Sequence, residues 1–163
     1  MSEVAAHNVL IVSGIGNSGP VWGTLMNPAD APEVLGVGGI EDDGRLAAFS
    51  SRGMSGWELP GGAGRVKPDL VTFGSHVFGS GVRGGCRALS GTSVACPVVA
   101  GAAALLASTM PAARRNRLLN PASLRQALAQ SATRLAGRSA FEQGAGRLEL
   151  LRSAQAPRPA SAA

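Results

Sequence analysis

The sequence is poor in cysteine and in aromatic residues, and both shortages narrow the possible functions. The two cysteines, Cys86 and Cys96, fit neither the spacing of a zinc site nor a disulfide framework, so we expect no metal ligands and two buried free thiols. Pairing of the two would need an oxidising compartment and suitable geometry. Four phenylalanines and two tryptophans are too few to interleave with the scattered arginines as a nucleic-acid site requires. The net charge of +5 therefore predicts a solvated basic face and no nucleic-acid partner.

Long hydrophobic runs are also absent. No uninterrupted apolar stretch reaches the roughly 18 residues that a membrane-spanning helix needs. Residues 1–4 carry no basic region of the kind that opens a signal peptide. We therefore expect membrane association only through parts outside this chain. The length of 163 residues, the hydrophobic fraction of 45% and the 23 glycines are typical of one compact domain with many tight turns.

Short apolar segments predict an α/β fold built on a parallel sheet. Residues 8–12 form an apolar run typical of a strand buried on both faces, preceded by the tail of a helix. The further strand candidates are 34–38, 69–72 and 87–89. These are few strands for a sheet that is covered on both sides.

The second half of the chain predicts helices. Residues 93–110 are apolar nearly all round, which indicates a buried helix, and a polar connector follows at 111–117. Asn120 is a good N-cap for a second helix, which we expect to run until Gly137 stops it. A turn at 141–148 is expected to lead into a short last helix.

Ser93 begins the first of these helices, directly after Gly91 and Thr92. A serine hydroxyl is a poor nucleophile unless a base takes its proton and nearby donors stabilise the oxyanion that forms. A helix N-terminus supplies unpaired N–H groups and a positive dipole end. Ser93 is therefore a candidate nucleophile, and the alternative is that Thr92 and Ser93 only cap a buried helix.

The glycine turn at 14–19 supports two incompatible interpretations. It fits the G-x-G-x-x-G pattern of a dinucleotide site, with Glu41 or Asp42 placed for a ribose contact, although Pro20 interrupts the helix that should follow. In the other interpretation Asn17 donates its amide to an oxyanion. An asparagine in such a turn also often serves only as a local turn residue.

Residues 91–97, Gly-Thr-Ser-Val-Ala-Cys-Pro, resemble the G-T-S-x-A-x-P signature of subtilisin-like serine proteases, the subtilases. Residues 14–19 resemble the family's A-A-G-N-x-G segment, 49–53 its F-S-S-R-G segment and 67–71 its K-P-D run. The resemblance implies that Ser93 is the nucleophile and Asn17 the oxyanion-hole residue. It also implies substrate-binding positions at Gly14, Ile15, Gly16 and Leu89, and a polypeptide substrate.

The resemblance covers residues 4–153 and corresponds to the C-terminal half of a subtilase catalytic domain. We therefore expect residues 1–153 to form part of a three-layer subtilisin-like fold, and 154–163 to be a tail or linker. The D-[ST]-G and H-G-T motifs that carry the triad aspartate and histidine are not in the sequence. His7 and His76 lie outside such motifs and are expected on the surface. Asp69 belongs to the structural K-P-D run.

Two functional hypotheses follow from that missing half. In one, the chain is part of an active serine endopeptidase whose N-terminal half supplies the aspartate and histidine. In the other, it is an inactive or peptide-binding remnant.

The segments 27–30, 51–54, 57–62 and 84–93 resemble a Golgi-resident processing branch of the family. That likeness implies secretory-pathway precursors as substrates and a location in the Golgi or endoplasmic reticulum lumen. The sequence indicates no definite cofactor. Structural calcium is possible by family, with no ligands assignable from the sequence.

Overall fold

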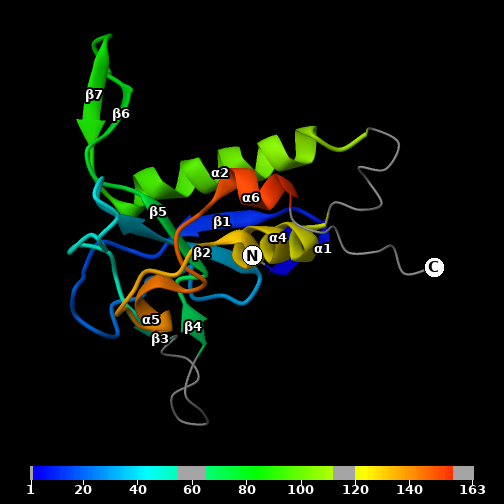
Figure 1. The fold of residues 1–163 in the computed structure, drawn as a ribbon, viewed down its shortest axis with the longest axis horizontal. Helices are drawn as coiled ribbons and strands as arrows, with labels where there is room; N and C mark the ends of the chain where they lie inside the picture. The colour runs from blue at the N-terminus through cyan, green and yellow to red at the C-terminus, as the bar shows by residue number, and fades with distance from the viewer. Residues whose placement is uncertain (1, 55–64, 112–119, 156–163) are drawn as a thin grey trace.

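The computed structural model describes residues 2–54, 65–111 and 120–155. Its centre is a sheet of three parallel strands in the order β1-β2-β5: β1 (Ile11–Gly14), β2 (Val34–Ile40) and β5 (Leu70–Phe73) (Figure 1). The predicted α/β class with a parallel sheet is confirmed. Strand β1 begins three residues later than position 8 and is only half-buried, because it lies at the edge of the sheet.

One face of the sheet carries the main hydrophobic core. Side chains alternate between faces along a strand, so Leu35, Val37 and Leu70 point to the same side. Helix α2 (Thr92–Ser108) packs against them, and α4 (Pro121–Ser131) and α6 (Leu150–Gln155) complete this core. A short helix, α1 (Ser2–Ala6), precedes the sheet.

Helix α2 is buried on one stripe, which corrects the prediction that it is buried all round. The buried apolar residues of this stripe recur at helical spacing: Ala95, Val99, Ala102, Ala103 and Leu106. Beside this stripe, one turn from Ala102, Val98 is 38% exposed and Leu105 is 56% exposed. The described residues therefore leave an apolar face of α2 uncovered.

The other face of the sheet holds the turn that follows β1. Ile15 is fully buried there and lies over Gly36 and Gly38 of β2, where a β-carbon would come within 3.3 Å of its side chain. Lys67 is also buried on this side and donates to the Val34 carbonyl at 2.6 Å. Small residues in β2 thus let the turn approach the sheet closely.

Asp69 anchors an ion-pair network at the start of β5. Its carboxylate accepts from Lys67 Nζ at 2.7 Å, from Arg125 Nη2 at 2.9 Å and from the Gly36 backbone N–H at 2.6 Å. Burial lowers the pKa of Lys67, and the Asp69 carboxylate acts to raise it. The prediction that the K-P-D run is structural is confirmed by these contacts.

The remaining elements depart from the predictions made from the sequence. Helix α4 ends at Ser131, before Gly137, because Thr133 leaves the helix to pair with Arg147. Residues 86–89 do form a strand, but in an antiparallel hairpin outside the main sheet. Two strand pairs and one helix were not predicted as such: β3 (Gly53–Met54) with β4 (Val66–Lys67), β6 (Val77–Ser80) with β7 (Cys86–Leu89), and α5 (Ala140–Gln143).

Some predicted segments cannot be compared with the structure. The segment 57–62, most of the connector at 111–117 and residues 156–163 of the tail lie outside the described residues. Helix α6 continues to Gln155, two residues into the predicted tail. No helix among those described has both the length and the apolar character needed to cross a membrane.

We predict that Asp69→Asn destabilises the fold by about 3 kcal/mol, because it leaves the buried Lys67 ammonium without its counter-charge. Thermal or urea unfolding measures the loss. Asp43→Asn is the matched control, since Asp43 pairs with Arg45 on the exposed surface and its loss is expected to change stability little. Equal stability of the two variants would contradict the structural role of the network.

Candidate active site

Ser93 lies in the first turn of α2 and is exposed to solvent. The N-cap residue is Gly91, with φ of 149° and no side-chain cap, so the alternative that Thr92 and Ser93 only cap the helix is wrong. Among the described residues neither the Ser93 hydroxyl nor its backbone N–H has a hydrogen-bond partner. A free N–H and a free hydroxyl therefore stand together at the positive end of a 17-residue helix.

The Thr92 side chain binds the glycine turn instead of a backbone N–H of its own helix. The Asn17 Oδ1 atom accepts from the Thr92 backbone N–H at 2.8 Å and from the Thr92 hydroxyl at 3.0 Å. That hydroxyl accepts in turn from the Gly16 N–H at 3.2 Å. A backbone N–H can only donate, so these bonds fix which end of the Asn17 amide is oxygen. The NH₂ group of Asn17 is left to point elsewhere.

Gly91 shows where that NH₂ group lies. A β-carbon built at Gly91 would be 3.1 Å from the Ser93 Oγ and 3.2 Å from the Asn17 Nδ2. These two atoms are consequently no more than about 6.3 Å apart, on the same side of the backbone. Any side chain at this position would crowd both groups. The positive φ at Gly91 is also one that glycine adopts most readily.

The F-S-S-R-G segment holds the glycine turn in position. The Ser51 N–H donates to the Gly16 carbonyl at 3.0 Å, and the Ser51 hydroxyl accepts from the Ser18 N–H at 3.1 Å. The Gly19 N–H donates to the Phe49 carbonyl at 2.9 Å. These bonds flank Asn17 on both sides. Sequence analysis missed the role of Ser51, whose only signal was its place in a family motif.

The dinucleotide interpretation of the same turn is wrong. A G-x-G-x-x-G motif must open a helix whose N-terminus binds the pyrophosphate. Residues 15–33 form turns and contain no helix. Glu41 and Asp42 follow β2 and line a shallow surface depression instead.

The four predicted substrate-binding residues occupy different environments. Leu89 ends β7 and is 41% exposed. Gly14 and Gly16 lie beside Thr92 and Met26, which fill the space a β-carbon would need at either glycine. The Ile15 side chain is fully buried, so any contact between Ile15 and a substrate would have to come from its backbone. A substrate-binding role for the four remains a prediction.

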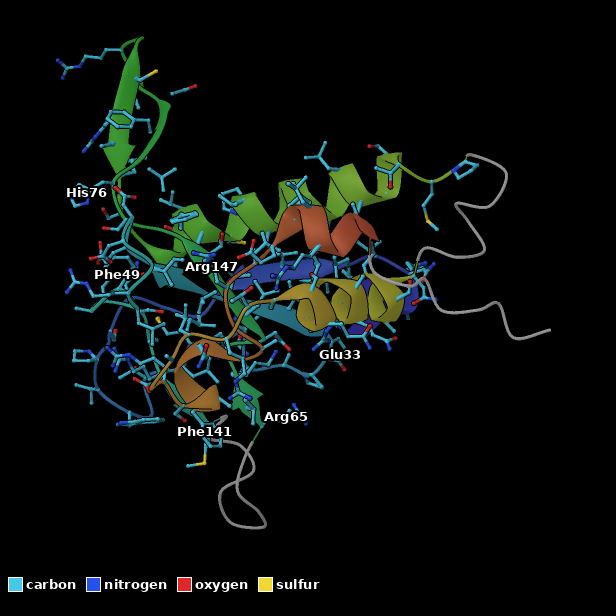
Figure 2. The ribbon with its side chains drawn as sticks, viewed as in Figure 1. Glu33, Phe49, Arg65, His76, Phe141 and Arg147 are labelled. Atoms are coloured by element: carbon cyan, nitrogen blue, oxygen red, sulfur yellow. The ribbon has the colours of Figure 1, made fainter. Side chains whose placement is uncertain are left out.

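Neither histidine of the chain hydrogen-bonds Ser93. His7 follows α1 and is exposed, and His76 is exposed at the base of the β6–β7 hairpin (Figure 2). The His76 Nδ1 atom is 3.0 Å from the Ser75 hydroxyl. The predicted surface location of both histidines is confirmed. The described residues place no general base on Ser93.

The two cysteines are free, but only one is partly shielded from solvent. Cys86 is exposed on β7, which corrects the expectation that both thiols are buried. The Cys96 thiol donates to the Val12 carbonyl at 3.3 Å, and burial raises the pKa of this thiol above its ordinary value. The described residues contain no group of three or more histidine, cysteine or acidic side chains that could hold a metal ion. Structural calcium therefore stays a family expectation without assigned ligands.

The fold and the site together define an α/β protein with a serine at a helix N-terminus beside an amide donor. The model of the subtilase family matches residues 2–146, and the chain belongs to that family. It is 63% identical over 153 residues to the membrane-bound transcription factor site-1 protease of Mus musculus, covering 94% of this chain and 14% of that protein. The subtilisin-like protease SBT6.1 of Arabidopsis thaliana is 59% identical over 151 residues, covering 93% of this chain and 14% of that protein.

A solved structure shows the same fold. The prenylagaramide maturation protease PagA superposes with a TM-score of 0.78 at 30% sequence identity, over 94% of this chain and 52% of that one. The chain thus spans about one seventh of the curated relatives it matches. The family resemblance predicted from the motifs is confirmed.

We predict that Thr92→Val, measured in the complete protein, weakens any activity that depends on the Asn17 amide. Valine keeps the shape of threonine but lacks the hydroxyl that donates to Asn17 Oδ1. The expected result is a fall in kcat of about tenfold with KM nearly unchanged, because the lost bond orients a transition-state donor. Thr109→Val, at the far end of α2, is the control. A change in KM alone would show that Thr92 shapes the binding surface instead.

The thiols provide a prediction that does not depend on activity. At pH 7 iodoacetamide should modify Cys86 many times faster than Cys96, because burial and the raised pKa leave Cys96 with little reactive thiolate. Peptide mapping by mass spectrometry measures both rates on the folded protein. Equal rates in the folded state would place Cys96 at an open surface, against the structure.

Proposed function

We propose that this chain is the nucleophile-bearing part of the catalytic domain of a serine endopeptidase. The observation that carries the proposal is the convergence of three groups: the Ser93 hydroxyl, the unpaired Ser93 N–H and the Asn17 amide. A nucleophile beside two oriented donors suits acyl transfer, in which negative charge develops on a carbonyl oxygen. Membership of the subtilase family supports the same reaction.

The proposed mechanism assigns one role to each group. The Ser93 Oγ attacks the carbonyl carbon of the scissile peptide bond, and its proton passes to a base. The Ser93 N–H and the Asn17 NH₂ donate to the oxyanion of the tetrahedral intermediate. The amine then leaves with that proton, and water hydrolyses the acyl group from Ser93.

No described residue acts as a base on Ser93, and we place the base and the residue that orients it outside this chain. Two features support a partner that completes the domain. Among the described residues no strand pairs with the outer edge of β1, and α2 exposes Val98 and Leu105 on a face that none of them covers. PagA also contains roughly as much chain again as the part that superposes. We propose that the N-terminal half of the same catalytic domain covers these surfaces.

The relatives support a more specific proposal for the substrate. The relative from Mus musculus is named a membrane-bound transcription factor site-1 protease, and the relative from Arabidopsis thaliana is named a subtilisin-like protease. Each shares about 60% of the aligned residues with this chain. We therefore propose secretory-pathway or membrane-bound precursor proteins as substrates, and the Golgi or endoplasmic reticulum lumen as the location.

Substitutions at Ser93 and Asn17 in the complete protein test the proposed reaction. Ser93→Ala should abolish peptide cleavage without unfolding the protein, because an exposed hydroxyl at a helix start contributes little packing. Asn17→Ala should lower kcat by about 10²–10³ with little change in KM, since its donor acts on the oxyanion. Asn120→Ala, which removes the N-cap of α4, controls for general destabilisation. Cleavage by Ser93→Ala within tenfold of wild type would overturn the assignment.

The alternative is a remnant that does not catalyse, and it is favoured for the isolated chain by the lack of a base at Ser93. We predict that residues 1–163 expressed alone hydrolyse no peptide, are poorly soluble because β1 and α2 are uncovered, and resist a fluorophosphonate probe at Ser93. Intact-mass measurement detects the adduct. Stoichiometric labelling of Ser93 in the isolated chain would require an activating base within it and would contradict the proposal.

A further inference from the structure

The β6–β7 hairpin stands apart from the layers of the domain (Figure 1). Every residue of its two strands except Val77 is exposed, and Phe78 is 75% exposed. Within the described residues no further strand pairs with either edge. Open strand edges and exposed apolar side chains are features that proteins usually cover. The hairpin is therefore a candidate interaction surface.

The pairing register defines one face of this hairpin. Arg87 lies opposite Gly79, and Leu89 lies opposite Val77. Side chains alternate between the two faces of a hairpin, so Val77, Arg87 and Leu89 share one of them, which we call the Arg87 face. Gly79 has no side chain, and the space beside its α-carbon is empty. Nothing across the hairpin therefore covers the Arg87 guanidinium.

The Arg87 face is cationic and has no counter-charge of its own. The Arg87 side chain forms no hydrogen bond or ion pair with the residues that the structure describes. The sequence contains no aspartate or glutamate between Asp69 and Glu142, a stretch that includes the whole hairpin and α2. A guanidinium beside a pair of apolar side chains, Val77 and Leu89, complements a carboxylate with an apolar neighbour.

The hairpin is continuous with the candidate active site. Two hydrogen bonds tie its base: the Gly91 N–H donates to the Gly74 carbonyl at 2.7 Å, and the His76 N–H donates to the Ser90 hydroxyl at 2.9 Å. Arg87 precedes Ser93 by six residues, which even a fully extended chain spans in about 20 Å. A polypeptide bound at Ser93 can reach the Arg87 face within about the same number of residues.

We propose that the Arg87 face binds an acidic residue of the substrate, located within about six residues of the scissile bond. This inference rests on the proposed function. A lipid surface shares the chemistry of negative charge beside apolar groups, but the open backbone edges of a two-stranded sheet cannot be satisfied in hydrocarbon. A polypeptide can satisfy them, and it must already lie beside Ser93.

The test compares two peptides with the complete enzyme. They differ only in carrying Glu or Gln at one position, which is moved in turn through the six residues on each side of the scissile bond. We expect kcat/KM to favour Glu two- to fivefold at one or two neighbouring positions, the size of one exposed ion pair, and salt to reduce the preference. Arg87→Gln should remove the preference, Arg87→Glu should reverse it and Arg87→Lys should retain part of it. Arg45→Gln, on an exposed ion pair outside the hairpin, should leave it intact.

Three results would overturn the inference. The first is a wild-type enzyme with no Glu preference at any position, and the second is a preference that survives Arg87→Gln. The third is Arg87-dependent binding of phosphatidylserine vesicles without any peptide preference, which would assign the face to a membrane. Fluorophosphonate labelling of Ser93 separates these from a failure of the proposed function. An enzyme that labels and cleaves without preference defeats only this inference, whereas one that does not label defeats both.

Discussion

The contact between the Asn17 amide oxygen and the start of α2 is the interaction on which the candidate site depends. It joins two segments 75 residues apart, at 2.8 Å from the Thr92 N–H and 3.0 Å from its hydroxyl. Because the oxygen is occupied, the donor end of the amide is free for a ligand. Thr92 is the first residue of the helix and Gly91 is the N-cap, so the helix begins without a side-chain cap. The Ser93 N–H beside it is left unpaired. One arrangement therefore supplies both donors that an oxyanion needs.

That contact is possible because the sheet positions its two sides. Strand β1 leads into the glycine turn, and the hydrogen bonds from residues 49–51 hold the turn over the sheet. Ile15 fills the space above the glycines of β2 and fixes the height of the turn. At the start of β5, the Lys67–Asp69–Arg125 network ties that strand to α4. The F-S-S-R-G and K-P-D segments thus have structural roles, because they hold the glycine turn and the sheet in position.

The local features of this architecture could be predicted from the sequence, and the tertiary ones could not. The strands at 34–38 and 69–72 are short apolar runs, which favour buried strands. The N-cap of α4 could also be predicted, because Asn120 lies directly before the helix that it caps. Nothing local shows that Thr133 pairs with Arg147 and ends α4 early. The exposure of one side of α2 also could not be predicted, because composition does not show which part of an apolar helix lacks a neighbour. Local chemistry made Ser93 and Asn17 candidates with structural alternatives, and their motifs favoured the catalytic roles, whereas the role of Thr92 required the fold.

The central claim is that Ser93 and Asn17 jointly form an oxyanion site. The most direct measurement is a crystal structure of the complete catalytic domain with Ser93 phosphonylated, since the phosphonyl oxygen mimics the oxyanion. The account predicts that this oxygen lies 2.7–3.1 Å from both the Ser93 N and the Asn17 Nδ2, the usual range for such donors, with Asn17 Oδ1 still bound to Thr92. An adduct whose oxygen faces solvent, or an Asn17 amide turned away from it, would contradict the claim.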